Sequence, residues 1–186
     1  MHATLCDFVQ DIALNAIEAA SPVTTVRIHE SETEFDASVD DEGRGMDKEE
    51  LEAARDPFVT APEKHPSRSV GLGLSFLHQL VEQTGGRLDI ASISGQGTSV
   101  RFVVPTDHLD CPPVGDVPGL AFSLMCYPGD YELVFSRTLV REQTRDYTVR
   151  RSELKEALGD LDSVASLGLL KEFLRGEESS LFALEV

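Results

Sequence analysis

Asp11 and Asn15 lie four positions apart in residues 4–20, where apolar residues recur at helical spacing. One helical turn separates them, so both side chains can reach one ligand from the same face of a helix. The amide oxygen of Asn15 is a hard neutral ligand suited to Mg²⁺, which prefers few protein ligands plus phosphates and water. The carboxylate of Asp11 could accept a proton from an attacking water or hydroxyl, or orient it. Alternatively, both residues belong only to the solvated face of an amphipathic helix.

A second group of acids and glycines, "VDDEGRGMD", occupies residues 39–47 and follows two predicted strands at 24–30 and 34–40. A carboxylate at the end of a strand can accept a hydrogen bond from an exocyclic amine such as the N6 amino group of adenine. Gly43 and Gly45 would let the backbone pass close under a base, because neither carries a Cβ. An ordinary Asp-Gly turn is the alternative explanation.

Gly71 and Gly73, in "VGLGLS", mark the junction between a proline-broken loop at 56–70 and a predicted helix at 71–84. The free N–H groups and positive end of a helix favour phosphate oxygens. The preceding loop carries Lys64 and Arg68, two cations that could help to neutralise phosphate charge. Thr98, in "GQGT", could offer a hydroxyl to phosphates or bound water. A solvated loop and a threonine that merely starts a strand are the alternatives.

The remaining elements divide the chain at a proline-rich stretch. Strands are expected at 87–93 and 98–105, and residues 106–118 are interpreted as a linker between domains at 1–105 and 119–186. The second of these domains is interpreted as a small α/β extension of unknown role. Its expected elements are strands at 120–127, 131–140 and near 146–149, then helices at 152–161 and 164–175.

Composition excludes several kinds of partner. The 186 residues include 16 Lys and Arg against 33 Asp and Glu, a formal charge of −17. This charge argues against nucleic acid, which needs a basic face, and against an anionic membrane surface. Three widely spaced cysteines indicate reduced thiols, and neither a secretory signal nor a membrane span is apparent. A cytoplasmic location is therefore expected.

In their order along the chain, these motifs resemble the ATP-binding domain shared by gyrase, Hsp90, histidine kinases and MutL (the GHKL family), in a form closest to histidine kinases. "DIALNAIEAA" looks like the first box of that family, "DEGRGM" the second, and "DPFVT" with "VGLGLS" the third. "GGRLDIASISGQGTSVRFVVP" is similar to the last two strands of a histidine kinase domain, and the resemblance covers residues 4–105. It implies a two-layer α/β sandwich of the Bergerat type, with helices on one face of a mixed sheet. ATP and Mg²⁺ would lie between the helices and a mobile lid.

The resemblance also implies a set of site residues. Asp41 would hold adenine, Asn15 would bind Mg²⁺, and Asp11 would act as base or water-orienting residue. The other nucleotide-binding residues it implies are Gly43, Gly45, Met46, Lys64, Arg68, Gly71, Leu72, Gly73, Leu74 and Thr98.

Two departures from the histidine kinase pattern shape the expected function. Asp11 replaces the asparagine of many histidine kinases, which tilts the chemistry toward a general base, and Glu18 replaces a usual basic residue. No histidine has the phosphoacceptor context, so an acceptor would have to come from outside these residues. We therefore expect an Mg-dependent ATP-binding domain that transfers the γ-phosphoryl group to water or to a partner protein, as an anti-sigma-like serine kinase or a detached histidine kinase domain. A non-catalytic module that senses ATP or ADP is the alternative, and a decayed interaction domain a third. The oligomeric state is not indicated.

Overall fold

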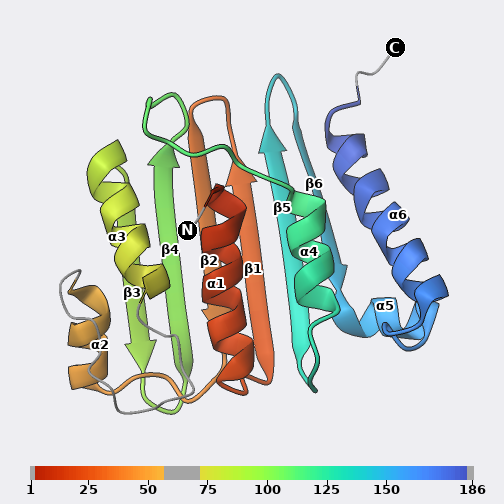
Figure 1. The fold of residues 1–186 in the computed structure, drawn as a ribbon, viewed down its shortest axis with the longest axis horizontal. Helices are drawn as coiled ribbons and strands as arrows, with labels where there is room; N and C mark the ends of the chain where they lie inside the picture. Colours follow the sequence, from red (N-terminus) through yellow and green to blue (C-terminus); the bar gives the residue numbers. More distant parts are fainter. Residues whose placement is uncertain (1–2, 57–71, 184–186) are drawn as a thin grey trace.

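A single mixed β-sheet forms one layer of the protein (Figure 1). The computed structural model describes residues 3–56 and 72–183. The strand order is β3-β4-β2-β1-β5-β6, in which β1 and β5 are parallel and all other neighbours are antiparallel. The strands are β1 (Val23–Glu30), β2 (Glu34–Asp41), β3 (Arg87–Ile93), β4 (Gly97–Pro105), β5 (Glu132–Val140) and β6 (Thr144–Arg150). The mixed sheet expected from the sequence is confirmed.

Helices form the second layer. They are α1 (Leu5–Glu18), α2 (Lys48–Arg55), α3 (Leu72–Thr84), α4 (Val117–Met125), α5 (Arg151–Leu158) and α6 (Val164–Leu181). In Figure 1, α1, α3 and α4 lie across one face of the sheet, which confirms the expected two-layer sandwich. Within the described ranges, no helix combines the length and apolar character that crossing a bilayer requires.

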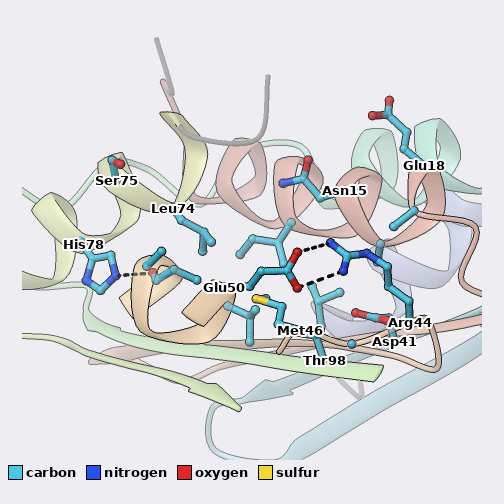
Figure 2. Close-up of a pocket in the computed structure, with 18 of the residues that line it drawn as sticks. Asn15, Glu18, Asp41, Arg44, Met46, Glu50, Leu74, Ser75, His78 and Thr98 are labelled. Atoms are coloured by element: carbon cyan, nitrogen blue, oxygen red, sulfur yellow. Dashed lines mark hydrogen bonds and ion pairs between the residues drawn. The ribbon is translucent and has the colours of Figure 1, made fainter. Parts of the chain in front are cut away.

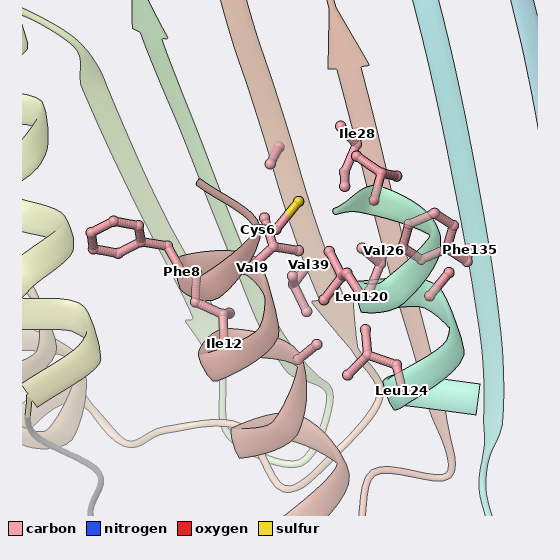
Figure 3. Packing of buried hydrophobic residues seen from close by; sticks show 14 of the residues in the cluster. Cys6, Phe8, Val9, Ile12, Val26, Ile28, Val39, Leu120, Leu124 and Phe135 are labelled. Atoms are coloured by element: carbon pink, nitrogen blue, oxygen red, sulfur yellow. The ribbon is translucent and has the colours of Figure 1, made fainter. Parts of the chain in front are cut away.

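The core lies between the sheet and these helices, because the strands alternate in burial. Val26, Val39 and Phe135 point from β1, β2 and β5 into this layer (Figure 3). They meet apolar side chains of α1 and α4, including Phe8, Val9, Ile12, Leu120 and Leu124. The alternate residues are polar and lie on the uncovered face, where Arg101 forms an ion pair with Asp36 at 2.6 Å.

The strand expected at 120–127 is wrong, because these residues belong to α4. Asp116 is the N-cap of this helix, and its side chain accepts a hydrogen bond from the N–H of Gly119 at 3.0 Å. Pro118 lies in the first turn, where its missing N–H costs nothing. The buried residues of the helix follow helical spacing: Val117, Leu120, Ala121, Leu124 and Met125. An unbroken apolar run of this length is compatible with either a strand or a buried helix, and here the cap decides for the helix.

Residues on both sides of the proline-rich stretch 106–118 join one sheet. The carbonyl groups of Pro113 and Val114 accept hydrogen bonds from the N–H groups of Leu5 and Cys6, both at 2.9 Å, so this stretch crosses the start of α1. Beyond it, α4 packs beside α1, and β5 pairs along the whole of β1. The helix that carries Asp11 and Asn15 is thereby in contact with the C-terminal part of the chain.

All three cysteines are free thiols. Cys6 is buried in the core, and this burial raises the pKa of its thiol to about 12. A thiol with so high a pKa is almost entirely protonated at neutral pH and is therefore a poor nucleophile. Cys6 thus has a packing role.

Candidate functional site

A cavity of about 320 Å³ lies between α1, α2, α3 and the strands β2 and β4 (Figure 2). Its volume falls in the range of small-molecule sites, and its walls are mainly apolar with a few polar groups. Six of the residues predicted to bind nucleotide line it: Asn15, Asp41, Gly45, Met46, Leu74 and Thr98. Residues far apart in the sequence are therefore brought together around one hollow.

Asp41 ends β2 and faces the cavity. Its Oδ1 accepts a hydrogen bond from the N–H of Gly43 at 2.7 Å, which orients the carboxylate. Thr98 is directly opposite Asp41 in the pairing of β2 with β4, and both residues line the cavity. This end of the cavity thus offers a carboxylate acceptor beside a hydroxyl.

Ser92, on β3, ties the turn after Asp41 to the neighbouring hairpin, and the sequence gave no indication of it. Its hydroxyl accepts a hydrogen bond from the N–H of Met46 at 2.8 Å and donates one to the carbonyl of Gly97 at 2.9 Å. The hydroxyl of Thr98 lies 3.0 Å away, in the same network. Ser92 thereby fixes Met46 and Thr98 relative to one another.

Gly45 is required by the same turn. Its φ is +62°, and a Cβ there would lie 2.1 Å from the carbonyl oxygen of Ile93. Because that neighbour is backbone, it has little freedom to yield. We expect Gly45→Ala to lower the free energy of unfolding by about 2–4 kcal/mol, the sum of left-handed strain and overpacking.

Gly95 provides the matched control, since its φ is +78° but no atom lies within 4 Å of the Cβ position. Gly95→Ala should cost only about 1 kcal/mol from backbone strain. Urea unfolding of the two variants measures the difference. Equal losses would show that close packing at Gly45 is unimportant.

Helix α1 presents Asn15 to the cavity and Asp11 to the start of α3. The helix begins with a capping box in which Thr4 and Asp7 satisfy each other's backbone N–H groups. Among the described residues, the lining of the cavity includes Asn15 and not Asp11, which lies one turn earlier. A Cβ on Gly73 would lie 3.0 Å from Oδ2 of Asp11, so Gly73 allows the two helices to approach closely at this carboxylate.

Helix α2 forms a third wall, held by polar contacts and without a buried residue of its own. Arg44 donates to both carboxylate oxygens of Glu50, at 2.9 and 3.0 Å, and this bonding raises the pKa of Arg44. At the other end of the helix, Arg55 donates to the carbonyl of Ile90. These contacts were not predicted. Of the described residues that line the cavity, Arg44 is the one with a full positive charge.

Several predicted site residues lie outside the described ranges. They are Lys64, Arg68 and Gly71, and with them the expected lid. Leu72 is the first residue of α3. No group of three or more potential metal ligands occurs among the residues that the structure describes. The amide of Asn15 at the cavity suits Mg²⁺ that takes its other ligands from phosphates and water.

Comparison with known proteins identifies the family. Residues 2–108 match the model of the histidine kinase-, DNA gyrase B- and HSP90-like ATPases. The chain belongs to this family. It therefore contains a histidine-kinase-like ATPase domain, and membership of the family implies ATP as the ligand. The Asp41 and Asn15 boxes both fall inside the matched residues.

Individual relatives of this ATPase domain include sensor kinases. The chain is similar to the sensor histidine kinase ZraS of Escherichia coli O157:H7, with 33% identity over 113 residues. It is also similar to the adaptive-response sensory kinase SasA of Synechococcus elongatus, with 27% identity over 101 residues. These alignments cover 60% and 53% of this chain, but only 24% and 26% of the two kinases. The chain thus spans about a quarter of the length of these relatives.

Among solved structures, the ATPase domain of Aquifex aeolicus MutL complexed with ADP is similar to this chain. The sequence identity is 14% and the TM-score is 0.43, over 87% of this chain and 69% of that one.

Proposed function

We propose that this domain binds Mg-ATP in the cavity between α1, α2, α3 and the sheet, and transfers the γ-phosphoryl group to a partner protein or to water. The observation that carries the proposal is that Asp41, at the end of β2, and Asn15, on α1, line the same cavity of about 320 Å³. A strand-end carboxylate and a helix amide are suited to the two ends of one nucleotide.

At the base end, the carboxylate of Asp41 accepts the N6 amino group of adenine. Its Oδ1 already accepts from Gly43, which leaves Oδ2 for the base. Thr98 lies opposite and places a hydroxyl at this same end, so we assign it to the base or to a water beside it rather than to the phosphates. The apolar side chains of Met46, Leu74 and Val100 line the cavity and supply contact for the ring.

At the phosphate end, Asn15 shares Mg²⁺ with the phosphates, and the metal neutralises charge that develops during transfer. Gly73 lies at the first turn of α3, where free N–H groups favour phosphate oxygens. Lys64 and Arg68 belong to the segment before this helix and are proposed to add positive charge. Catalysis then depends mostly on positioning and charge neutralisation.

In the chemical step, an acceptor atom of the partner, or a water oxygen, attacks the γ-phosphorus. The bond between that phosphorus and the β,γ-bridging oxygen breaks, and ADP leaves with the electron pair. Asp11 takes the proton from an attacking hydroxyl or water. Serine, histidine and water are all chemically competent acceptors.

Asp41→Asn tests the base end of this site. We expect the affinity for Mg-ATP to fall by about 10- to 100-fold, since a hydrogen bond to a charged acceptor is lost and an amide N–H₂ faces the adenine amine. Isothermal titration calorimetry gives the affinity. A melting-temperature series with Mg-ATP, ADP and an unhydrolysable analogue tests whether nucleotide stabilises the folded state.

Asp40→Asn is the matched control. Asp40 precedes Asp41 on the same strand but faces away from the cavity, where it pairs with Arg27. Its substitution should leave the affinity unchanged. No stabilisation of the unaltered protein by any nucleotide would overturn the proposed function. Binding with neither phosphate release nor a labelled partner would show a nucleotide sensor instead of a kinase.

A further inference from the structure

A hydrogen bond joins the cavity to the C-terminal part of the chain. Glu18, on the last turn of α1, lines the cavity one turn after Asn15. The hydroxyl of Tyr127 donates to Oε1 of Glu18 at 2.7 Å, across 109 positions of sequence. In Figure 2 the carboxylate of Glu18 points away from Asp41 and Arg44, on the side of α1 to which the amide of Asn15 also points.

Tyr127 is itself held firmly. It follows α4, and its carbonyl accepts hydrogen bonds from the hydroxyl of Tyr131 at 3.0 Å and from Arg151 at 3.3 Å. The negative charge of Glu18 raises the pKa of the Tyr127 hydroxyl, which agrees with a tyrosine that donates to a carboxylate. The donor is therefore fixed by the C-terminal part of the protein, while the acceptor belongs to the helix of the nucleotide site.

The charge of Glu18 gives this bond a consequence. Residues three apart on a helix are neighbours, so a freely rotating Glu18 can bring its carboxylate toward the group bound at Asn15. If that group is a triphosphate with its Mg²⁺, the two net negative charges repel. The bond from Tyr127 keeps the carboxylate in one orientation and prevents this approach.

We propose that Tyr127 is a positioning residue that holds Glu18 clear of the phosphate tail. The affinity for Mg-ATP then depends on how the segment after α4 packs against α1. This inference rests on the proposed function, since it needs the phosphates to lie near Asn15. It assigns the C-terminal residues a part in nucleotide binding that they perform without touching the nucleotide.

Four proteins test the inference: the unaltered chain, Tyr127→Phe, Glu18→Gln, and the double variant. We expect Tyr127→Phe to weaken Mg-ATP binding by about three- to fivefold at low salt, the size of an exposed charge interaction. In the Glu18→Gln background the same tyrosine substitution should have no effect, because the charge is gone. Calorimetric dissociation constants at low and high salt measure both, and salt should reduce the difference.

Tyr147→Phe is the matched control. Tyr147 also donates to a glutamate, Glu178 at 3.0 Å, but does not line the cavity. Its substitution should not change the affinity. Unchanged or tighter binding by Tyr127→Phe, or an equal loss in both backgrounds, would overturn the inference while leaving the proposed function intact. An unaltered protein that does not bind Mg-ATP would overturn both.

Discussion

Asp11→Asn is expected to slow phosphoryl transfer or ATP hydrolysis by about 10²- to 10⁴-fold, the usual contribution of a positioned general base. The side chain keeps its size, but an amide cannot take the proton from an attacking hydroxyl or water. The carboxylate lies at the start of α3, where a Cβ on Gly73 would be 3.0 Å from Oδ2. Single-turnover phosphate release, or label transfer to a partner, measures the rate.

The affinity for Mg-ATP is the internal control for this variant. Because Asp11 is proposed to act on the attacking group, its substitution should leave the dissociation constant nearly unchanged. Unchanged turnover would remove Asp11 from the role of base. Loss of binding together with turnover would assign it to nucleotide binding.

Arg151→Met is expected to lower the free energy of unfolding by about 3–5 kcal/mol, the range for losing one member of a buried charged network. Arg151 is only 5% exposed, and its guanidinium lies 4.1 Å from the centre of the Tyr131 ring. It donates to four carbonyl oxygens at the end of α4 and in the following turn: those of Met125, Tyr127, Gly129 and Tyr131. Methionine fills similar space but leaves these carbonyls without their donor.

Urea unfolding measures the loss, with Arg150→Met as the matched control. Arg150 is the preceding residue, but its side chain is half exposed and its contact with Glu153 is 3.9 Å long. We expect that substitution to change stability by no more than about 0.5 kcal/mol. Similar losses for the two variants would contradict a specific role for the guanidinium of Arg151.

Much of the fold could be predicted because local pattern and tertiary structure agree. The helix that starts after Thr4 has both an apolar stripe and a capping box. The two hairpins around Ser31 and Gly95 have strict alternation and polar turns. The error at 120–127 arose where a continuous apolar run removed the periodicity. The parallel pairing of β5 with β1 could not be predicted, because no local pattern specifies which distant strand lies alongside.

The candidate site divides in the same way. Asp41 and Asn15 could be predicted because each belongs to a short local motif with a chemical reason. Ser92 could not, since a serine in a strand has no distinctive local context, and its bond to Met46 spans 46 positions. The pair of Glu18 and Tyr127 was likewise hidden, because it joins a predicted helix to a segment that was given the wrong secondary structure.

The pairing of β5 with β1 also affects where this protein can be shortened. A fragment that ends at residue 108, where the family match stops, would keep β1 but lose the strand that covers its far side. The N–H and C=O groups of β1 would then form an open sheet edge, which favours pairing with other chains and aggregation. The unit that can be handled alone in solution is thus longer than the unit that homology marks out.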